Sequence, residues 1–356
     1  MLFSTQPGLS SFSFSILFTL AIAIGCRQGP QKQNLEEPQM AGNPIFEGWY
    51  ADPEGAVFDQ GFWVYPTYSD DFEKQLHLDA FSSKDLIHWT KHQRILDTTK
   101  IKWLRQALWA PSIIKKETEY YLFFGANDIQ RPGRSSYDPK NDINHYGGIG
   151  VAVGATPAGP FKDYLGKPLI SDFYNDAQPI DQFVFEDVDG TFYFFYGGWG
   201  HCNLGVLNDD FTGFVPWEDG QLFQEITPEG YVEGPFMFLR NNIYYFMWSE
   251  GNWTDGSYRV VYATAKKATG PYKRMGTVLE SDNEIATGAG HHSVINVPGT
   301  DNWIMVYHRR PIPNKDRDHR VTCMDKMEFN AEGTIKPIMM TREGVEGVTF
   351  PDMDIK

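Results

Sequence analysis

Three acidic residues each stand directly before, or at the start of, a short apolar stretch: Asp52, Asp181 and Glu233. Carboxyl groups that share one site raise one another's pKa, so one can hold a proton near neutral pH while another stays ionised. Such a pair can protonate a leaving oxygen and activate a water molecule, which is the chemistry of glycoside hydrolysis. The alternatives are a structural metal site made of these acids and a histidine, or ordinary solvated acids.

The acids belong to a repeated pattern in which a short apolar strand, a polar turn and an aromatic-rich strand follow one another. Five segments show it, at residues 55–69, 111–128, 182–200, 231–251 and 292–310. A weaker repeat of two more strands lies between them, at 148–170 and 258–280, with 76–92 and 319–340 in the same role. One unit is therefore four antiparallel strands, too few to bury their apolar faces alone. Such units predict an all-β, five-bladed β-propeller with four-stranded blades; the alternative is a β-sandwich with unrelated hairpins.

In a propeller the first strand of each blade lines the central axis, so the residues just before these strands should converge. Those positions hold the three acids together with Trp109 and His291. Gly234 and Pro235, which follow Glu233, fit a sharp backbone entry that directs the acid inward. The repeat therefore predicts one site at one end of the axis.

The segments around these residues resemble the signature segments of glycoside hydrolase family 43. They are W-Y-A-D-P-E-G at 49–55, L-W-A-P-S at 108–112, P-I-D-Q-F-V-F at 179–185, Y-V-E-G-P-F at 231–236 and G-A-G-H-H-S-V at 288–294. The resemblance implies a propeller and an inverting hydrolase of arabinose- and xylose-containing glycans. It assigns Asp52 to the general base, Glu233 to the general acid, and Asp181 to the acid that orients and tunes Glu233. It also implies calcium near the axis at His291, with His292 as the alternative.

The expected substrate-binding residues are aromatic or polar residues near the ends of blades. They are Trp109, Trp199, His201, Trp253, Arg320 and Asn127. Each aromatic residue could equally pack between blades, and Asn127 could simply form a turn. Arg320 lies where the family often has a basic residue that reaches the pocket, but it could also be an exposed strand residue.

Long loops such as residues 129–147 predict a covered pocket, which favours release of single terminal sugars. We therefore expect an exo-acting α-L-arabinofuranosidase. The alternatives are a β-xylosidase, a β-D-galactofuranosidase, an endo-arabinanase or a non-catalytic carbohydrate-binding propeller. A retaining fructosidase-like propeller would need an Arg-Asp-Pro motif and a Glu-Cys pair, and the sequence has neither.

The formal net charge of −15 argues against nucleic acid and anionic membrane surfaces as partners. A neutral oligosaccharide or polysaccharide fits this charge, and we expect a monomer without an organic cofactor.

The first residues resemble an export signal. Residues 12–24 form an apolar run too short to span a bilayer, and small residues follow before Cys26. We expect a lipoprotein-type signal at 1–26, a flexible tether at 27–43 and the catalytic domain at 44–356. The protein would then be anchored by lipid in the cell envelope, at the outer membrane or in the periplasm. An ordinary secretory signal is the alternative, since no Lys or Arg precedes the run. Cys202 and Cys323 are expected to be buried thiols.

Overall fold

The computed structural model describes residues 38–58, 61–131, 134–135, 147–314 and 316–350. The predicted signal, Cys26 and residues 27–37 of the tether lie outside these ranges, as does most of the loop 129–147. Within the described residues, no helix is both long enough and apolar enough to cross a membrane.

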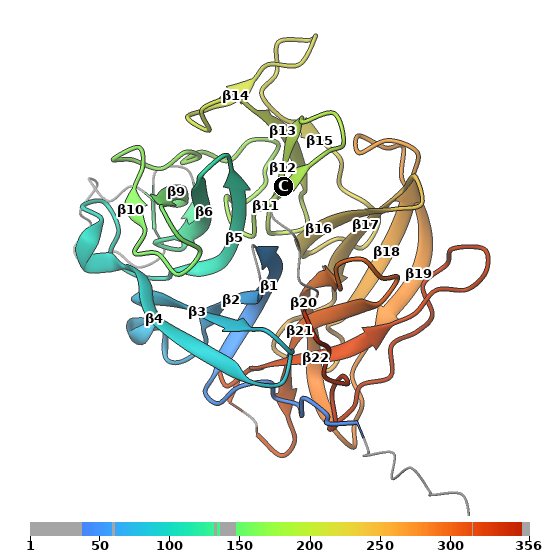
Figure 1. Cartoon of the computed structure of the whole chain (residues 1–356). Helices are drawn as coiled ribbons and strands as arrows, with labels where there is room; N and C mark the ends of the chain where they lie inside the picture. The colour runs from blue at the N-terminus through green and yellow to red at the C-terminus, as the bar shows by residue number, and fades with distance from the viewer. Residues whose placement is uncertain (1–37, 59–60, 132–133, 136–146, 315, 351–356) are drawn as a thin grey trace, which may run out of the picture. The chain divides into compact units, whose positions relative to one another are not determined.

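Five small antiparallel sheets form a ring, which confirms the predicted five-bladed propeller (Figure 1). The first strand of each blade lies nearest the centre of the ring, and the later strands lie progressively further out. The five predicted two-strand segments are the first two strands of the five blades. The second strands are rich in aromatic residues because both of their faces are covered by neighbouring blades.

Three blades follow the predicted four-strand order. Blade 1 contains β1 (Tyr50–Phe58), β2 (Gly61–Tyr68), β3 (His77–Ser83) and β4 (Trp89–Asp97). Blade 2 contains β5 (Trp109–Lys116), β6 (Glu119–Ala126), β9 (Gly148–Gly154) and β10 (Lys162–Asp163). Blade 4 contains β16 (Glu233–Arg240), β17 (Ile243–Glu250), β18 (Arg259–Ala265) and β19 (Lys273–Leu279).

The remaining elements depart from that order. Blade 3 contains β11 (Phe183–Glu186), β12 (Phe192–Tyr196), β13 (Asn203–Leu207) and β14 (Phe214–Val215), and β15 (Gln224–Glu225) also pairs with β13. Blade 5 contains β20 (Ala286–Asn296), β21 (Trp303–Pro311) and β22 (Val321–Met327). A hairpin of β7 (Ile129–Arg131) and β8 (Arg134–Ser135) separates β6 from β9, and two short 3-10 helices are η1 (Phe72–Lys74) and η2 (Thr98–Lys100).

Blade 5 joins the two ends of the described chain. The predicted unit 319–340 contributes the strand β22, whose outer edge meets the segment that precedes β1. Ile45 N–H donates to the carbonyl of Thr322 at 3.1 Å. The side chain of Asn43 donates to the carbonyl of Met324 and accepts from its N–H, at 2.9 and 2.8 Å. The segment before blade 1 therefore covers the edge of β22 and closes the ring.

Polar side chains link the inner strands of neighbouring blades at one repeated position. A side chain on one inner strand accepts a hydrogen bond from a backbone N–H on the next: Glu54 from Ile113 at 2.8 Å, Ser112 from Val184 at 3.2 Å and Ser293 from Gly55 at 2.7 Å. Blades 3 and 4 have Phe183 and Phe236 at the equivalent position, and these rings contact each other at 4.3 Å between centroids. Three of the five junctions between inner strands thus have such a hydrogen bond, and the junction of blades 3 and 4 has an aromatic contact instead.

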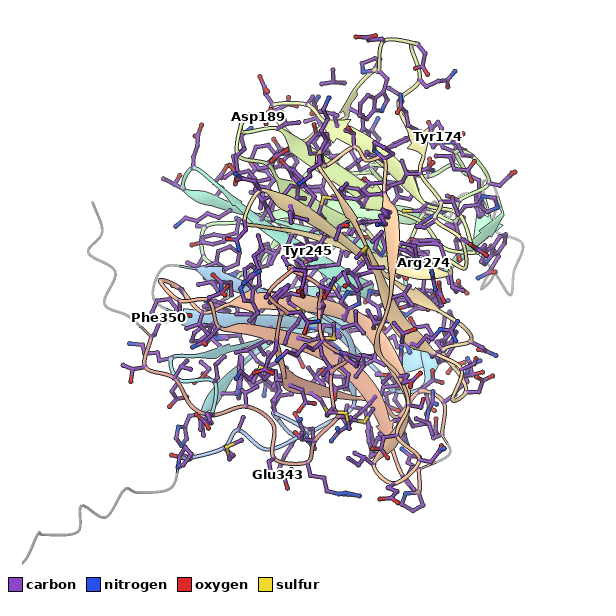
Figure 2. All side chains as sticks on the ribbon, turned by 90° about the vertical axis from the view of Figure 1, so that its right-hand side faces the viewer. Tyr174, Asp189, Tyr245, Arg274, Glu343 and Phe350 are labelled. Carbon is purple, nitrogen blue, oxygen red and sulfur yellow. The ribbon has the colours of Figure 1, made fainter. Side chains whose placement is uncertain are left out.

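The core fills the spaces between blades with large aromatic side chains. Tyr245, labelled in the side view of Figure 2, is fully buried and stacks on Phe238 with ring centroids 4.7 Å apart. Cys202 and Cys323 are buried and unpaired, as predicted. Burial of this apolar area is the dominant favourable contribution to folding.

Candidate active site

One repeated position, within or just before the innermost strand of every blade, has the left-handed backbone conformation. These residues are Asp52 (φ 48°), Ala110 (φ 42°), Asp181 (φ 53°), Gly234 (φ 64°) and His291 (φ 36°). Four of the five inner strands also carry a β-bulge here, after Ala51, Trp109, Glu233 and Gly290. Bulges re-aim side chains and are common beside active sites.

Glu233 is offset by one residue from the other two acids. Gly234, not Glu233, is the equivalent of Asp52 and Asp181, and Glu233 is the equivalent of Trp109. The repeat pattern predicted one class of position for all three acids, and the structure corrects this. Glu233 therefore enters the site from a different backbone position.

Side chains from the preceding blade hold this strained backbone in place. In three blades the N–H of the left-handed residue donates to a side chain near the end of the preceding blade's second strand: Ala110 to Thr67 at 2.7 Å, His291 to Ser249 at 2.9 Å and Asp52 to His308 at 3.1 Å. The sequence analysis missed these residues. In the sequence, these residues could be recognised as polar residues near the end of an aromatic strand, as in W-S at 248–249 and Y-H at 307–308.

A pocket of about 590 Å³ lies at this end of the axis. That volume is within the usual range for small-ligand sites. Its lining includes Asp52, Asp181, Glu233, His291, Trp109, Trp199, Trp253 and Arg320. Eight of the predicted site residues, from all five blades, are therefore brought together.

Two predicted substrate-binding residues do not line this pocket. Asn127 is buried, and its side chain accepts from the N–H groups of Arg105 and Gln106 while donating to the carbonyl of Trp103. His201 contacts Glu225 at 2.9 Å instead. Asn127 thus fixes residues 103–106, a segment distant in sequence, and His201 lies outside the pocket lining.

Asp52 is the acid that the surroundings keep ionised. Its Oδ1 lies 3.0 Å from Nη1 of Arg320, 3.1 Å from Nδ1 of His308 and 3.4 Å from Nδ1 of His291. Burial by itself raises the pKa of Asp52, but the charge of Arg320, followed by His291, outweighs it and holds that pKa well below its usual range. Arg320 is buried, which rules out the alternative of an exposed strand residue.

Glu233 and Asp181 have the opposite electrostatics. Burial raises the pKa of Glu233 to about 7; the hydrogen bond from Tyr258 lowers it, the Asp52 charge raises it and Arg320 lowers it. Burial, then the charges of Glu233 and Asp52, raise the pKa of Asp181 well above its ordinary value. The site therefore combines an ionised carboxylate, Asp52, with two neighbouring carboxyls that share a proton near neutral pH, as acid–base hydrolysis needs.

Tyr258 is a further residue that the sequence analysis missed. Its hydroxyl donates to Oε1 of Glu233 at 2.8 Å, and its ring stacks on His308 with centroids 5.8 Å apart. A Cβ at Gly290 would lie 2.2 Å from this ring, so that glycine of the G-A-G-H-H motif leaves space for it. No periodicity in the sequence connects residue 258 with residue 233.

The three tryptophans of the pocket have different surroundings. Trp199 is 52% exposed and lies 5.3 Å from the ring of Phe173, so much of its surface is accessible to a ligand. Trp253 packs against the guanidinium groups of Arg317 and Arg320, at 5.2 and 5.0 Å from the ring centroid. Trp109 donates from Nε1 to the side chain of Gln75. Trp199 thus has the most open surface of the three.

The described residues do not form a calcium cage. They contain no group of three or more His, Cys, Asp or Glu side chains placed to hold a metal ion. Both ring nitrogens of the buried His292 lack a hydrogen-bond partner among these residues, and its ring lies 5.9 Å from that of Phe236. Calcium takes six to eight oxygen ligands, which imidazoles cannot supply. We therefore assign no chemical step to a metal ion.

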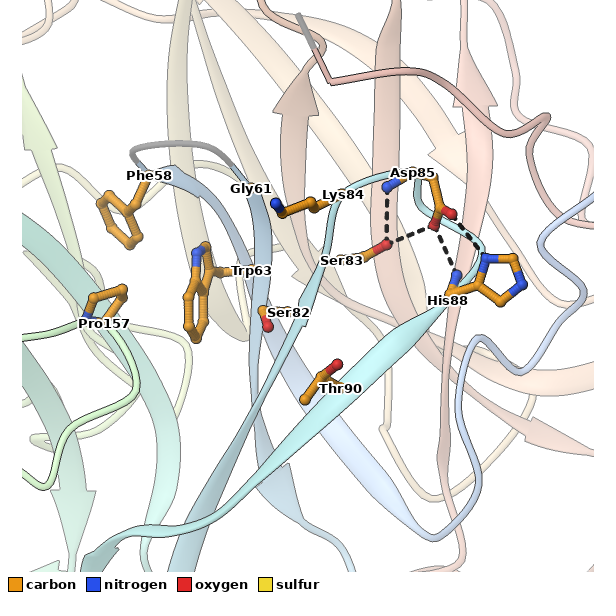
Figure 3. A pocket seen from close by; sticks show the side chains of 10 residues that line it. All are labelled: Phe58, Gly61, Trp63, Ser82, Ser83, Lys84, Asp85, His88, Thr90 and Pro157. Carbon is orange, nitrogen blue, oxygen red and sulfur yellow. Dashed lines mark hydrogen bonds and ion pairs between the residues drawn. The ribbon is translucent and has the colours of Figure 1, made fainter. Parts of the chain in front are cut away.

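A second hollow, of about 480 Å³, lies over blade 1 and contains none of the predicted catalytic residues (Figure 3). Its carboxylate, Asp85, accepts hydrogen bonds from the N–H groups of Ile87 and His88 and from the hydroxyl of Ser83. Those bonds form a turn, and the three predicted catalytic acids lie in the axial pocket instead.

The sequence of residues 41–335 matches the model of glycosyl hydrolases family 43. The chain belongs to this family. It is 44% identical to β-D-galactofuranosidase xynD of Aspergillus niger, over 87% of this chain and 88% of that protein. The structure is also similar to an α-L-arabinofuranosidase of Clostridium thermocellum, with a TM-score of 0.65 and 27% identity over 83% of this chain and 95% of that one.

A third similarity concerns the fold alone. A β-xylosidase/α-arabinofuranosidase from a compost metagenome, determined with xylotriose in a calcium-free form, has a TM-score of 0.67 and 24% identity. It covers 85% of this chain and 96% of that one. Family membership identifies this chain as a glycosidase, so its three acids lie in the pocket of a glycoside hydrolase.

Proposed function

We propose that this family 43 enzyme is an inverting, exo-acting furanosidase whose preferred substrate carries terminal β-D-galactofuranose. The observation that carries the choice of sugar is the 44% identity with the A. niger β-D-galactofuranosidase over 87% of the chain. This replaces α-L-arabinofuranose, our expectation from the sequence, as the first choice. The axial pocket, at about 590 Å³, suits the end of a glycan chain.

The chemistry divides between the acids. Glu233, protonated near neutral pH, donates its proton to the glycosidic oxygen as the bond to the anomeric carbon breaks. Asp52, held ionised, accepts a proton from the water that attacks this carbon from the opposite face, which inverts its configuration. Asp181 orients Glu233 and influences its pKa.

The second candidate sugar is α-L-arabinofuranose. The similarity to the C. thermocellum α-L-arabinofuranosidase, at 27% identity, favours it. The two sugars have the same ring configuration, and galactofuranose is longer by one hydroxymethylene group. A pocket that excludes this extra group would reject galactofuranose, whereas one that hydrogen-bonds it would prefer galactofuranose strongly.

Aryl glycosides test the choice directly. The purified protein would be assayed with the 4-nitrophenyl derivatives of β-D-galactofuranose, α-L-arabinofuranose and β-D-xylopyranose. We expect kcat/KM to be at least about tenfold higher for the galactofuranoside than for the other two. A higher value for the arabinofuranoside would make the second candidate the function. Asp52→Asn is the control, because loss of the proposed base should abolish hydrolysis of all three aryl glycosides, and activity that survives would come from a contaminant.

We also propose that the protein is exported and anchored through Cys26. The apolar run at 12–24, followed by small residues and this cysteine, supports the proposal. Cys26→Ser should then move the protein from the membrane fraction to the soluble fraction with unchanged specific activity. A wild-type protein found in the soluble fraction would contradict it.

A further inference from the structure

Two loops from neighbouring blades form one wall of the pocket. The loop between β17 and β18, residues 251–258, carries Trp253. The loop between β21 and β22, described at residues 312–314 and 316–320, carries Arg317, Asp318 and Arg320. Trp253 is only half-buried, and its ring contacts guanidinium groups of the second loop at 5.0 and 5.2 Å. The position of this wall therefore depends on how the two loops are held together.

Arg310, near the end of β21, bonds to the backbone of both loops. Its guanidinium donates to four carbonyls: Asp316 at 3.1 Å, Arg317 at 3.1 Å, Trp253 at 3.0 Å and Thr254 at 3.4 Å. The side chain is 4% exposed. A planar guanidinium with a fixed set of donors can hold several acceptors in one geometry, which a lysine cannot do.

The fold leaves space for the Arg310 guanidinium and its bonds to the two loops, which together are called the clamp below. Gly288 lies on β20 beside Arg310, with a φ of +61°. A Cβ at that position would lie 3.0 Å from Nη1 of Arg310 and 3.3 Å from the carbonyl oxygen of Trp253. The first glycine of the G-A-G-H-H motif thus accommodates the clamp, as the second accommodates Tyr258.

The adjacent residue provides a matched comparison. Arg309 is also on β21 and is 3% exposed, but its Nη1 donates to the carbonyl of Thr341 at 2.7 Å. Arg309 is not part of the pocket lining, and neither is Thr341. Two neighbouring buried arginines therefore bind carbonyls, but only Arg310 binds the loops that form the pocket wall.

We propose that Arg310 is a positioning residue that fixes the substrate-contacting wall of the pocket by clamping the loops 251–258 and 312–320 together. It acts through Trp253 and Arg317 and does not touch the reacting atoms. The inference rests on the proposed role of this pocket as the substrate site, whichever furanose it accepts.

The clamp itself is tested without any substrate, by limited trypsin cleavage after Arg317. Arg310 binds the carbonyl of this bond, and the Arg317 side chain is 60% exposed. In Arg310→Lys we expect the cut after Arg317, identified by mass spectrometry, to be about tenfold faster than in wild type, because local opening exposes the loop. Arg309→Lys should leave this rate unchanged. Equal rates in wild type and Arg310→Lys would overturn the clamp.

The consequence for binding is tested with whichever aryl furanoside the wild type cleaves, so a wrong choice of sugar does not affect the result. Arg310→Lys should raise KM about tenfold with kcat changed less than about threefold, because binding and not chemistry is disturbed. In a Trp253→Ala background the same change should raise KM less than about twofold, since the two residues act through one wall. Equal KM effects in both backgrounds, or the same KM effect from Arg309→Lys, would mean a general structural role.

A second variant covers the case in which Arg310→Lys does not fold. Gly288→Ala places a methyl group against Arg310 and keeps the charge. It should raise KM and accelerate the cut after Arg317, as Arg310→Lys does. If folded Gly288→Ala protein shows neither the higher KM nor the faster cut, the proposal is overturned.

Discussion

Nη1 of Arg320 lies 3.0 Å from Oδ1 of Asp52, and both side chains are buried. This pair joins the loop before β22 to the first strand of blade 1, across the point where the ring closes. The same guanidinium also lowers the pKa values of Glu233 and Asp181. One cation therefore lowers the pKa of all three acids.

Arg320→Gln should move both limbs of the pH–rate profile to higher pH. Removal of the cation raises the pKa of Asp52, whose ionised form is needed, and that of Glu233, whose protonated form is needed. We expect shifts of about one pH unit in the profile of kcat/KM, together with a large loss of rate. Limbs that move in opposite directions, or only one limb that moves, would show that Arg320 does not control both acids.

Tyr258→Phe should move only the basic limb, also to higher pH. The tyrosine hydroxyl donates to Glu233 and thereby favours the ionised carboxylate, so its loss raises the pKa of Glu233 above about 7. We expect kcat to fall about tenfold because the acid loses a fixing hydrogen bond. The measurement is the pH dependence of kcat/KM beside that of wild type. A basic limb at lower pH would contradict the assigned hydrogen bond.

Asp181→Asn should move the basic limb in the opposite direction. The Glu233 charge raises the pKa of Asp181. Coupling between two sites is reciprocal, so an ionised Asp181 raises the pKa of Glu233 in turn. Asparagine keeps the shape without the charge, and we expect the limb to move about one unit to lower pH. A large loss of rate with an unmoved limb would instead indicate a direct bond between Asp181 and the sugar.

The repeat and the positions of the acids could be predicted from the sequence because they follow from local patterns. Strand pairs, turns and the acids beside them recur in order, and the fold places such residues at the axis. The one-residue offset of Glu233 could not be predicted, because it depends on a bulge and on a left-handed Gly234. Tyr258 reaches Glu233 across the strands of blade 4, His308 reaches Asp52 of blade 1, and Arg310 reaches loops of blades 4 and 5, so only the folded structure brings these residues together.

Asn127 and His201 were predicted to bind substrate but do not line the pocket. Both are polar residues near strand ends, which is where ligand-binding residues are found, but such positions also hold turns and surface pairs. Asn127 satisfies three backbone groups of residues 103–106, and His201 contacts Glu225. The sequence does not show which polar groups already have partners.

Glu54→Gln should reduce the loss of stability as pH rises. Burial raises the pKa of Glu54 from its usual 4.5 to about 8, although bonds from Ile113 and Ser112 lower it. The folded protein therefore binds more protons than the unfolded chain between these values, and its stability falls as pH rises through that window. Glutamine keeps an acceptor for Ile113 and has no proton to lose.

Thermal unfolding at several pH values checks this. From about pH 5 to about pH 8, Tm of the wild type should fall by about 5 °C more than Tm of Glu54→Gln, since both proteins keep the other raised acids. Parallel curves for the two proteins would mean that Glu54 is already ionised in the folded state.

The most direct test of the account is the configuration of the first sugar released, followed by proton NMR during hydrolysis of an aryl furanoside by the wild-type enzyme. If Asp52 activates water while Glu233 protonates the leaving group, the new sugar appears first as the inverted anomer, which is the α form from a β-D-galactofuranoside. The β anomer as first product would mean that a carboxylate attacks the sugar directly, and it would contradict the roles assigned to Asp52 and Glu233.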